Sequence, residues 1–199
     1  MKRLTLVSIL GAGLLLACPV MATNGYFSHG YGPVSKSLAG ACVAITSSAL
    51  CSATNPAILS HRGTHWEIAA ALFAPDRGFK AKDESPPPPP PPASIPPGTY
   101  DSDNDYFLIP HFAYTRKLDE DISVGMIVGG QGGKNTEYDS AVFTNFRSPG
   151  NVASSPTGMD LIQMFTGLNV AWQVNRQNSL AIMPVLAVQR LEVQGLEPF

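Results

Sequence analysis

The chain has 199 residues, a net charge of −2 at pH 7 and a charged fraction of only 14%. It has no basic patch, which argues against a nucleic-acid partner. The 18 glycines and 18 prolines favour a β-rich chain with many turns.

The first residues have the pattern of a secretory signal. Lys2 and Arg3 precede the apolar run Leu4–Ala17, and residues suited to signal-peptidase cleavage end at Ala22. We therefore predict a signal peptide over residues 1–22. The apolar run is shorter than the roughly 20 residues that a membrane-spanning helix needs.

The cysteines leave two questions open. Cys18 ends a stretch that resembles a lipoprotein signal, and under that alternative it would be acylated. Once residues 1–22 are removed, Cys42 and Cys51 remain, in an oxidising compartment where a disulfide can form between them. Two buried free thiols are the alternative.

Residues 23–60 fit no strand pattern. They are rich in Gly, Ala and Ser, which permit tight turns and close packing of the backbone. We predict a short helix within residues 35–45 and a turn at Asn55-Pro56-Ala57 that ends the segment. Such a compact segment would either plug the lumen of a following barrel or form a periplasmic tail.

Residues 61–199 alternate between apolar and small or polar side chains in five places, most clearly over residues 161–174. Successive side chains of a strand point to opposite faces. One predicted face holds Ile162, Met164, Leu168, Val170, Trp172 and Val174, and the other holds Gln163, Gly167, Asn169, Ala171 and Gln173, with Phe165 as its one large apolar residue.

That segment is long for a soluble protein, in which strands usually have roughly five or six residues. A transmembrane β-strand needs about 9–11 residues. The length and the alternation therefore predict a strand with lipid on one side and a polar lumen on the other. The same pattern predicts strands over residues 65–73, 106–116, 122–130 and 180–188.

The connections between these strands alternate in length. Residues 117–121 and 175–178 are short turns, whereas residues 75–105 and 131–159 are predicted long extracellular loops. Outer-membrane barrels have short periplasmic turns and long outer loops. We therefore predict an all-β, antiparallel transmembrane barrel in the outer membrane, with Trp66, Tyr114 and Trp172 near the periplasmic boundary. A soluble β-sandwich is the alternative.

An ordered set of short motifs resembles a known family. The motifs are Asn24-Gly25-Tyr26-Phe27-Ser28-His29-Gly30-Tyr31-Gly32, Ser37-Leu38-Ala39-Gly40-Ala41 and Ala53-Thr54-Asn55-Pro56-Ala57, with further matches over residues 73–77, 107–110 and 132–138. Together they resemble the N-terminal part of the outer-membrane long-chain fatty acid transporters, the FadL/TodX-like family.

The resemblance implies a plugged barrel that takes up hydrophobic molecules. Its plug, called the hatch, would contain short helices, and the matching hatch positions are Asn24, Gly25, Phe27, Gly30, Gly32, Gly40, Asn55, Pro56 and Ala57. In this family a kink in the third strand opens the wall sideways and releases the ligand. Here that kink would fall at Gly129, Gly130, Gly132 and Gly133, since glycines often mark bends or bulges. Alternatively, these glycines begin an outer loop.

Two departures from the family stand out. Cys42 and Cys51 occupy positions where small non-thiol residues are expected, so a disulfide there would stiffen the plug. In addition, about five strands are too few, because bacterial single-chain barrels have an even number of at least eight. We therefore expect an incomplete barrel, which would be either the N-terminal part of a longer protein or a truncated gene product.

No pattern of an enzyme stands out. The sequence lacks close metal-ligand spacing, a phosphate-binding glycine loop and a nucleophile elbow, so we expect no catalysis, metal or cofactor. The expected partners are fatty acids or hydrocarbons and outer-membrane lipid. A structural or adhesive outer-membrane barrel without transport is the alternative, although a scaffold has no need of a plug.

Overall fold

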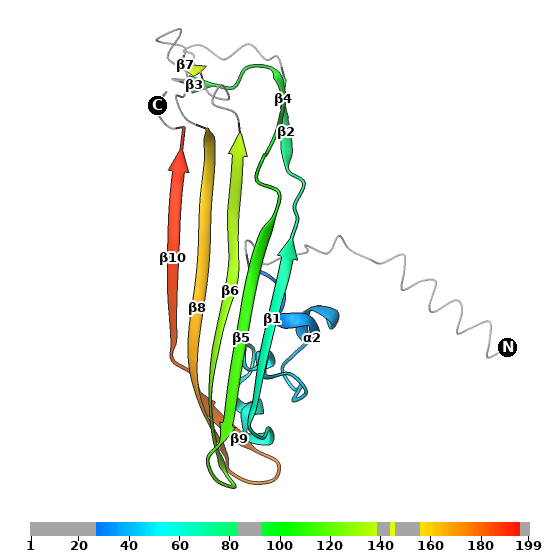
Figure 1. Ribbon diagram of the computed structural model, residues 1–199, viewed down its shortest axis with the longest axis vertical. Coiled ribbons are helices and arrows are strands. Elements are labelled where there is room, and N and C mark those ends of the chain that lie inside the picture. Colours follow the sequence, from blue (N-terminus) through cyan, green and yellow to red (C-terminus); the bar gives the residue numbers. More distant parts are fainter. Residues whose placement is uncertain (1–26, 83–92, 139–143, 146–155, 196–199) are drawn as a thin grey trace, which may run out of the picture.

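The computed structural model describes residues 27–82, 93–138, 144–145 and 156–195 (Figure 1). Its main element is a long antiparallel sheet of six strands in the order β1-β5-β6-β8-β10, with β9 paired to β8. The strands are β1 His65–Phe73, β5 Phe107–Lys117, β6 Ile122–Tyr138, β8 Thr157–Gln173, β9 Ser179–Ile182 and β10 Val185–Gln194. The predicted all-β, antiparallel class is confirmed. Within the described residues the sheet has β1 and β10 at its edges and does not close.

The sheet has a lower and an upper end. The lower end, as drawn in Figure 1, carries the turns of residues 118–121 and 174–178. The upper end carries two small sheets, in which β2 Gly78–Ala81 pairs with β4 Gly98–Asp101 and β3 Ala93–Ser94 pairs with β7 Thr144–Asn145. The predicted loop of residues 75–105 therefore contains a pair of antiparallel strands. The rings of Phe79 and Tyr100 stack across this pair, with their centroids 5.0 Å apart.

The third predicted strand is longer than its sequence pattern indicates. We expected a loop over residues 131–159, whereas β6 continues to Tyr138 and pairs with β8 as far as Thr157. The expectation was wrong because the side chains of this stretch no longer alternate between apolar and polar. Backbone pairing with β8, rather than an apolar face, defines the strand there.

The last strand is interrupted at Met183-Pro184, between β9 and β10. Proline has no N–H for the ladder, which explains the break. The Pro184 carbonyl still accepts a hydrogen bond from Leu168 N at 3.2 Å. Val170 pairs with Ile182 below the break and Gly167 pairs with Val185 above it, so the register continues and the two faces are preserved.

The two faces of the sheet differ as the alternation predicts. One face, here called the open face, presents large apolar side chains such as Leu108, Leu168 and Ile182, of which Leu108 is 72% exposed. The other, the covered face, presents buried side chains in its lower half, including Ala113, Phe165 and Asn169. The large apolar side chains of the open face are therefore exposed, although the solvent-facing side of a water-soluble antiparallel sheet is normally polar.

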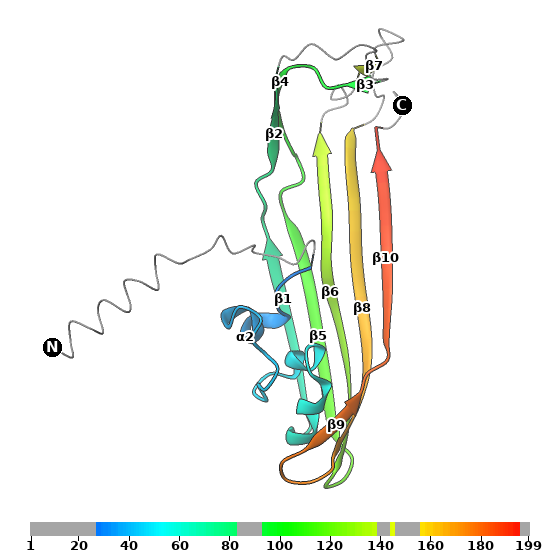
Figure 2. The same cartoon turned by 180° about the vertical axis from the view of Figure 1, so that it is seen from behind.

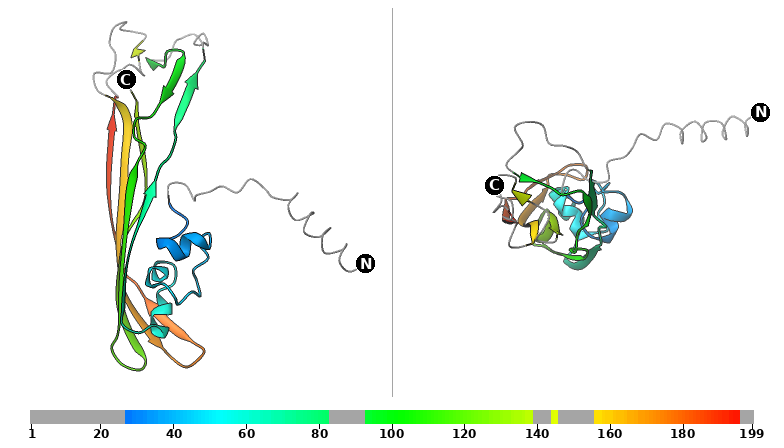
Figure 3. Two further views of the ribbon diagram at one scale, coloured as in Figure 1. Left: turned by 45° about the vertical axis from the view of Figure 1, so that its right-hand side comes forward. Right: turned by 90° about the horizontal axis from the view of Figure 1, so that it is seen from above.

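The N-terminal segment, residues 27–62, lies against the lower half of the covered face (Figures 2 and 3). It contains the short helix α2 Gly32–Ser37 and the 3₁₀ helices η1 Ala49–Ala53 and η2 Pro56–His61. None of the described helices is both long and apolar enough to cross a membrane.

Two predictions for this segment need correction. The helix expected within residues 35–45 ends at Ser37, because Ala39 and Gly40 have positive φ angles of 52° and 88° that turn the chain. Asn55-Pro56-Ala57 does not end the segment but begins η2. The Asn55 side chain accepts a hydrogen bond from Ala57 N at 3.1 Å, and Pro56 occupies the first helical position.

The hydrophobic core forms between the N-terminal segment and the sheet. One cluster joins Ile58, Leu59 and the two cysteines to Ala171, and a second joins Leu50 to Ile127 and Phe165. Burying a leucine side chain contributes about 1.5–3 kcal/mol. The segment is therefore held to the sheet chiefly by these contacts, while the open face makes none of them.

Candidate functional site

A carboxylate of the sheet holds the start of η1. Glu67 of β1 accepts hydrogen bonds from Ala49 N at 2.7 Å, from Leu50 N at 3.4 Å and from the Ser48 hydroxyl at 2.9 Å. Ser48 occupies the N-cap of η1 but makes no side-chain bond to the helix itself. Glu67 therefore performs the task of an N-cap from another element of the fold, and the helix N-terminus favours its negative charge.

A second polar contact lies at the lower end. The Ser60 hydroxyl is 2.8 Å from that of Ser179 at the start of β9, and Ser179 Oγ is 3.1 Å from His61 Nε2. Between the contact of Glu67 and that of Ser179, a third contact joins β8 to η1: Asn169 Nδ2 is 3.5 Å from Ser52 Oγ. The N-terminal segment is thus bonded to the sheet at a few separate points.

Several other polar groups at this interface have no protein partner among the described residues. They include Thr115 Oγ1, Ser123 Oγ, Asn169 Oδ1 and Ser35 Oγ, all of which are buried. Buried polar groups normally bond to protein or to ordered water. Among the described residues, protein groups therefore satisfy only part of the hydrogen-bonding capacity at this interface.

The sheet opens between β5 and β6 in its upper half. These strands pair only from Lys117–Ser123 up to His111–Gly129. Above that point β5 continues to pair with β1 and β6 continues to pair with β8, so the two halves of the sheet part (Figure 1).

The predicted glycines lie at this opening. Gly129, Gly130, Gly132 and Gly133 are all inside β6, so the alternative that they begin an outer loop is wrong. The register against β8 shifts between Gly130 and Gly132, which marks a β-bulge at Gln131.

Close packing explains why these positions carry no side chain. A Cβ on Gly130 would lie 2.6 Å from Ile109 Cγ2, and one on Gly129 would lie 3.0 Å from His111 Cδ2. At Gly133 the nearest atom would be the backbone oxygen of Leu161, at 2.4 Å. The first two contacts involve side chains that are able to move, whereas the third involves backbone.

The beginning of the N-terminal segment reaches the opening. Phe27 forms a β-bridge with Gly132, and Ser28 N donates to the Gln131 carbonyl at 3.1 Å. Tyr31 follows, with its ring centroid 5.1 Å from that of Phe165. Burial raises the pKa of Tyr31, although a hydrogen bond with Gln131 lowers it in part, so the phenol stays neutral at pH 7.

A groove of about 470 Å³ occupies the opening and reaches both faces of the sheet. Leu108, Ile162 and Met164 line it from the open face. The rest of its lining consists of Phe27, Ser28, Phe73, Arg77, Tyr106, Phe107, Ile109, Pro110, Gly130, Gly132, Gly133, Asn135, Leu161 and Gln163. Arg77 is its one charged side chain among the described residues.

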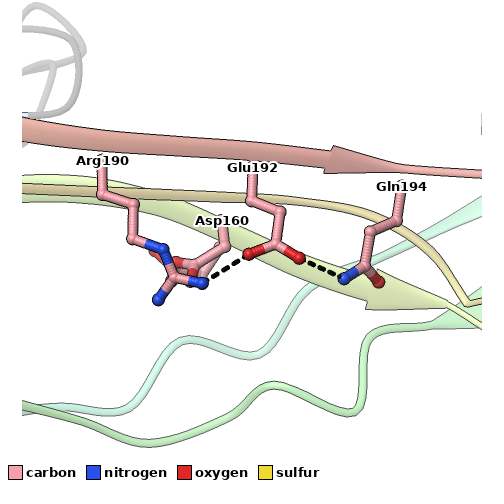
Figure 4. Close-up of polar contacts among 5 residues, drawn as sticks. Asp160, Arg190, Glu192 and Gln194 are labelled. Carbon is pink, nitrogen blue, oxygen red and sulfur yellow. Dashed lines mark hydrogen bonds and ion pairs between the residues drawn. The ribbon is translucent and has the colours of Figure 1, made fainter.

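Polar residues replace the apolar ones at the upper end of the open face. Asp160 and Glu192 are direct register partners, and like charges so placed repel. Each has its own partner: Arg190 forms an ion pair with Glu192 at 2.5 Å (Figure 4), and the Asn135 amide donates to Asp160. A cavity of about 110 Å³ adjoins this group and Gln194.

The predicted hatch residues are found in two places. Gly30, Gly32 and Gly40 have positive φ angles in the N-terminal segment, and residues 55–57 begin η2. A Cβ on Gly40 would also lie 2.7 Å from the His29 carbonyl oxygen. Phe27 lies at the opening, whereas Asn24 and Gly25, together with the predicted signal peptide and Cys18, lie outside the described residues.

Cys42 and Cys51 form a disulfide, with their Cα atoms 5.4 Å apart and both residues fully buried. The alternative of two free thiols therefore does not describe this structure. Two other residues were given no role from the sequence: Glu67 and Arg77. A charged residue in the otherwise apolar stretch of β1 was the available signal for Glu67, but its partners lie 17–19 residues away in the chain.

Comparison of the chain with protein-family models, with curated proteins and with solved structures gives no match.

Proposed function

We propose that this protein forms the wall of an outer-membrane β-barrel and takes up hydrophobic compounds, namely long-chain fatty acids or hydrocarbons. In this proposal the N-terminal segment is the plug of the barrel. The compounds diffuse passively and leave sideways through the opening between β5 and β6. An unpaired strand edge is costly in lipid, so we further propose that β1 and β10 are paired by additional strands in the assembled barrel.

One observation carries the membrane part of the proposal: the open face of the sheet exposes large apolar side chains on strand after strand. Soluble monomers rarely expose contiguous apolar patches larger than a few hundred Å². Leu72, Leu168 and Leu186 are each more than half exposed and lie on different strands of one face. Lipid is the surrounding that makes such a face favourable.

The ends of the open face support a definite orientation. Trp66 and Tyr114 are register partners near the lower end, and Trp172 lies beside Ile122 at the same end. Aromatic residues gather at the boundaries of membrane barrels. Asp160, at the upper end, belongs to the polar group, so a belt of apolar residues lies between two boundaries.

The groove supports the transport part of the proposal. A hydrophobic ligand gains little from a water-filled pore, whereas a groove lined on both faces of the wall offers it apolar contacts along the way to lipid. The N-terminal segment blocks only the lower half of the covered face, and its first described residues end beside the groove. A scaffold without transport has no use for either feature.

Two experiments test the two parts. Cells that produce the protein should accumulate radiolabelled hexadecanoate faster than cells that lack it, and equal uptake would refute transport and favour the scaffold.

The membrane part is tested by fluorescence, because both tryptophans, Trp66 and Trp172, lie on the open face and are 64% and 50% exposed. Brominated lipids should quench them, and undiminished fluorescence would contradict a lipid-facing surface.

A further inference from the structure

We infer that the disulfide of Cys42 and Cys51 forms before the N-terminal segment docks on the sheet, by exchange with a thiol–disulfide oxidase. The inference goes beyond the proposed function and depends neither on transport nor on a ligand. It concerns the order of two maturation steps and the class of partner that the chain meets between them. The oxidising compartment follows from the predicted signal peptide.

Neither cysteine is accessible once the segment has docked. Cys42 and Cys51 are both 0% exposed, and they share a core cluster with Ile58 and Leu59 of η2 and with Ala171 of β8. A disulfide forms when a thiolate attacks a sulfur of another disulfide, so the two reacting sulfurs must meet. A protein oxidase therefore has no path to these sulfurs while the segment lies against the sheet.

The disulfide belongs to a set of contacts that the segment makes with itself. It joins residues that are nine positions apart, the Asn55 amide donates to the Val43 carbonyl at 2.8 Å, and the Arg62 guanidinium donates to the Thr46 carbonyl. None of these three contacts requires the sheet. Contacts between residues close in sequence cost less chain entropy than distant ones, so this loop closes while the segment is still free.

The polar contacts that hold the segment to the sheet join more distant parts of the chain. Ser60 and Ser179 are 119 residues apart, and Ser52 and Asn169 are 117 residues apart. These contacts require β8 and β9 to be in place. A loop that is already closed also has less conformational freedom to lose when it docks, so oxidation favours the step that follows it.

The partner that fits this step is an oxidase with a reactive Cys-X-X-Cys disulfide. One thiolate of the pair attacks a sulfur of that disulfide, which forms a mixed disulfide and releases one thiolate of the partner. The second cysteine then attacks the chain's own sulfur in the mixed disulfide and releases the partner's other thiolate. The two thiols lose two electrons and two protons in total, and the oxidase is reduced to its dithiol.

The test measures when the two thiols react, in a Cys18→Ser background so that only this pair contributes. The full chain is unfolded in urea and reduced, and an oxidised Cys-X-X-Cys protein is added either before or after transfer into an uncharged detergent. Remaining thiols are counted by the gel shift that a polyethylene-glycol maleimide produces. We expect oxidation to be about a hundredfold faster before the transfer, because the folded chain must first open locally.

Two results of this experiment would contradict the inference. A reduced chain that tryptophan fluorescence shows to be folded, and that is oxidised as fast as the unfolded chain, would overturn the order of the steps. Failure of the oxidase to react with the unfolded chain would refute this class of partner. A reduced chain that does not fold would support the order, since docking would then require the disulfide.

Reduction provides the reverse measurement on the folded protein. A water-soluble phosphine should cleave the disulfide of the folded, oxidised chain about a hundredfold more slowly than that of the chain in urea, again because local opening must precede the attack. Equally fast reduction in both states would overturn the inference, because the sulfurs would then be open to exchange after docking.

An exposed neighbour supplies the matched control. Val43 follows Cys42 and is 62% exposed. Val43→Cys, combined with Cys42→Ser and Cys51→Ser, should therefore react with the maleimide at once in the folded protein. Cys51→Ser alone leaves Cys42 as a single buried thiol, which should stay unlabelled until urea is added. Equal labelling of the two thiols in folded protein would contradict the inference.

Discussion

The lower and upper halves of the sheet have the same alternation but different neighbours. In the lower half, the N-terminal segment covers one face and buries Ile127 and Ala171 completely, and Glu67 of β1 caps η1. In the upper half that face has no such cover: Leu191 and Val193 of β10 are 56% and 42% exposed, and β5 and β6 separate. Alternation thus determines which side chains share a face, while the N-terminal segment determines which part of the covered face is buried.

The largest effect should follow loss of packing in the lower half. Leu59 is fully buried, and it fills the space above Gly125, where a Cβ would lie 2.7 Å from Leu59 Cδ1. Leu59→Ala should lower the free energy of unfolding by about 2–5 kcal/mol. Denaturant unfolding followed by tryptophan fluorescence measures this change. Leu108→Ala, on the open face of the upper half, is the control and should have a much smaller effect; equal losses would contradict the difference between the halves.

The cap at η1 should come next. Glu67→Gln removes the charge but keeps the shape, so the bonds from Ser48, Ala49 N and Leu50 N weaken, at a cost of about 1–3 kcal/mol. Hydrogen exchange of the η1 amides should speed up while the β6–β8 ladder stays protected. Glu120→Gln, in the exposed turn below β5, should leave both unchanged. Unaltered exchange in η1 would show that Glu67 does not hold this helix.

The opening should respond to added side chains in a position-dependent way. Gly129→Val with Gly130→Val should slow hexadecanoate uptake several-fold, because the new methyl groups meet His111 and Ile109, of which Ile109 lines the groove. The fold should survive, since those side chains are able to move. Gly133→Val meets the Leu161 backbone instead and should impair folding, which the amount of protein in the membrane would reveal. Unchanged uptake in the double variant would argue against release through this opening.

The smallest effect concerns the lower turn. Asp119 accepts hydrogen bonds from Ile122 N at 2.7 Å and Asp121 N at 2.9 Å, and these bonds lower the pKa of its carboxyl below the usual 3.8. Because the folded-state pKa is lowered, the stabilisation is complete above the usual value and is lost as the pH falls through the lowered one.

Amide exchange of Asp121 and Ile122 should therefore become faster at the acid end relative to other turns, after correction for the intrinsic rate. Asp119→Asn should remove this pH dependence, while the amides of the β8–β10 ladder serve as the reference. A turn whose relative exchange does not change with pH would show that the carboxylate does not order it.

Sequence patterns predicted the sheet better than the site. β1 has its expected bounds because large apolar side chains such as Ile68 and Leu72 alternate with smaller ones. The upper part of β6 was missed because Asn135 and Glu137, at positions that share the open face, are polar. Glu67 and Arg77 were given no role because their partners come from distant parts of the chain, and only the folded backbone brings them together.

The bulge at Gln131 also distributes charge between the two faces of the sheet. Below it, even-numbered residues of β6 such as Val128 are on the open face; above it, Gly133 pairs with Ile162 and Asn135 pairs with Asp160, so odd-numbered residues take that side. In an unbulged strand Lys134 would stand opposite Asp160 and would neutralise it. Instead, the extra residue Gln131 places Lys134 opposite Leu161, on the covered side. Asp160 and Glu192 remain on the open side. The upper part of the sheet thereby carries Lys134 on the side of the N-terminal segment and a net negative charge on the open side, where Asp160 and Glu192 outnumber Arg190.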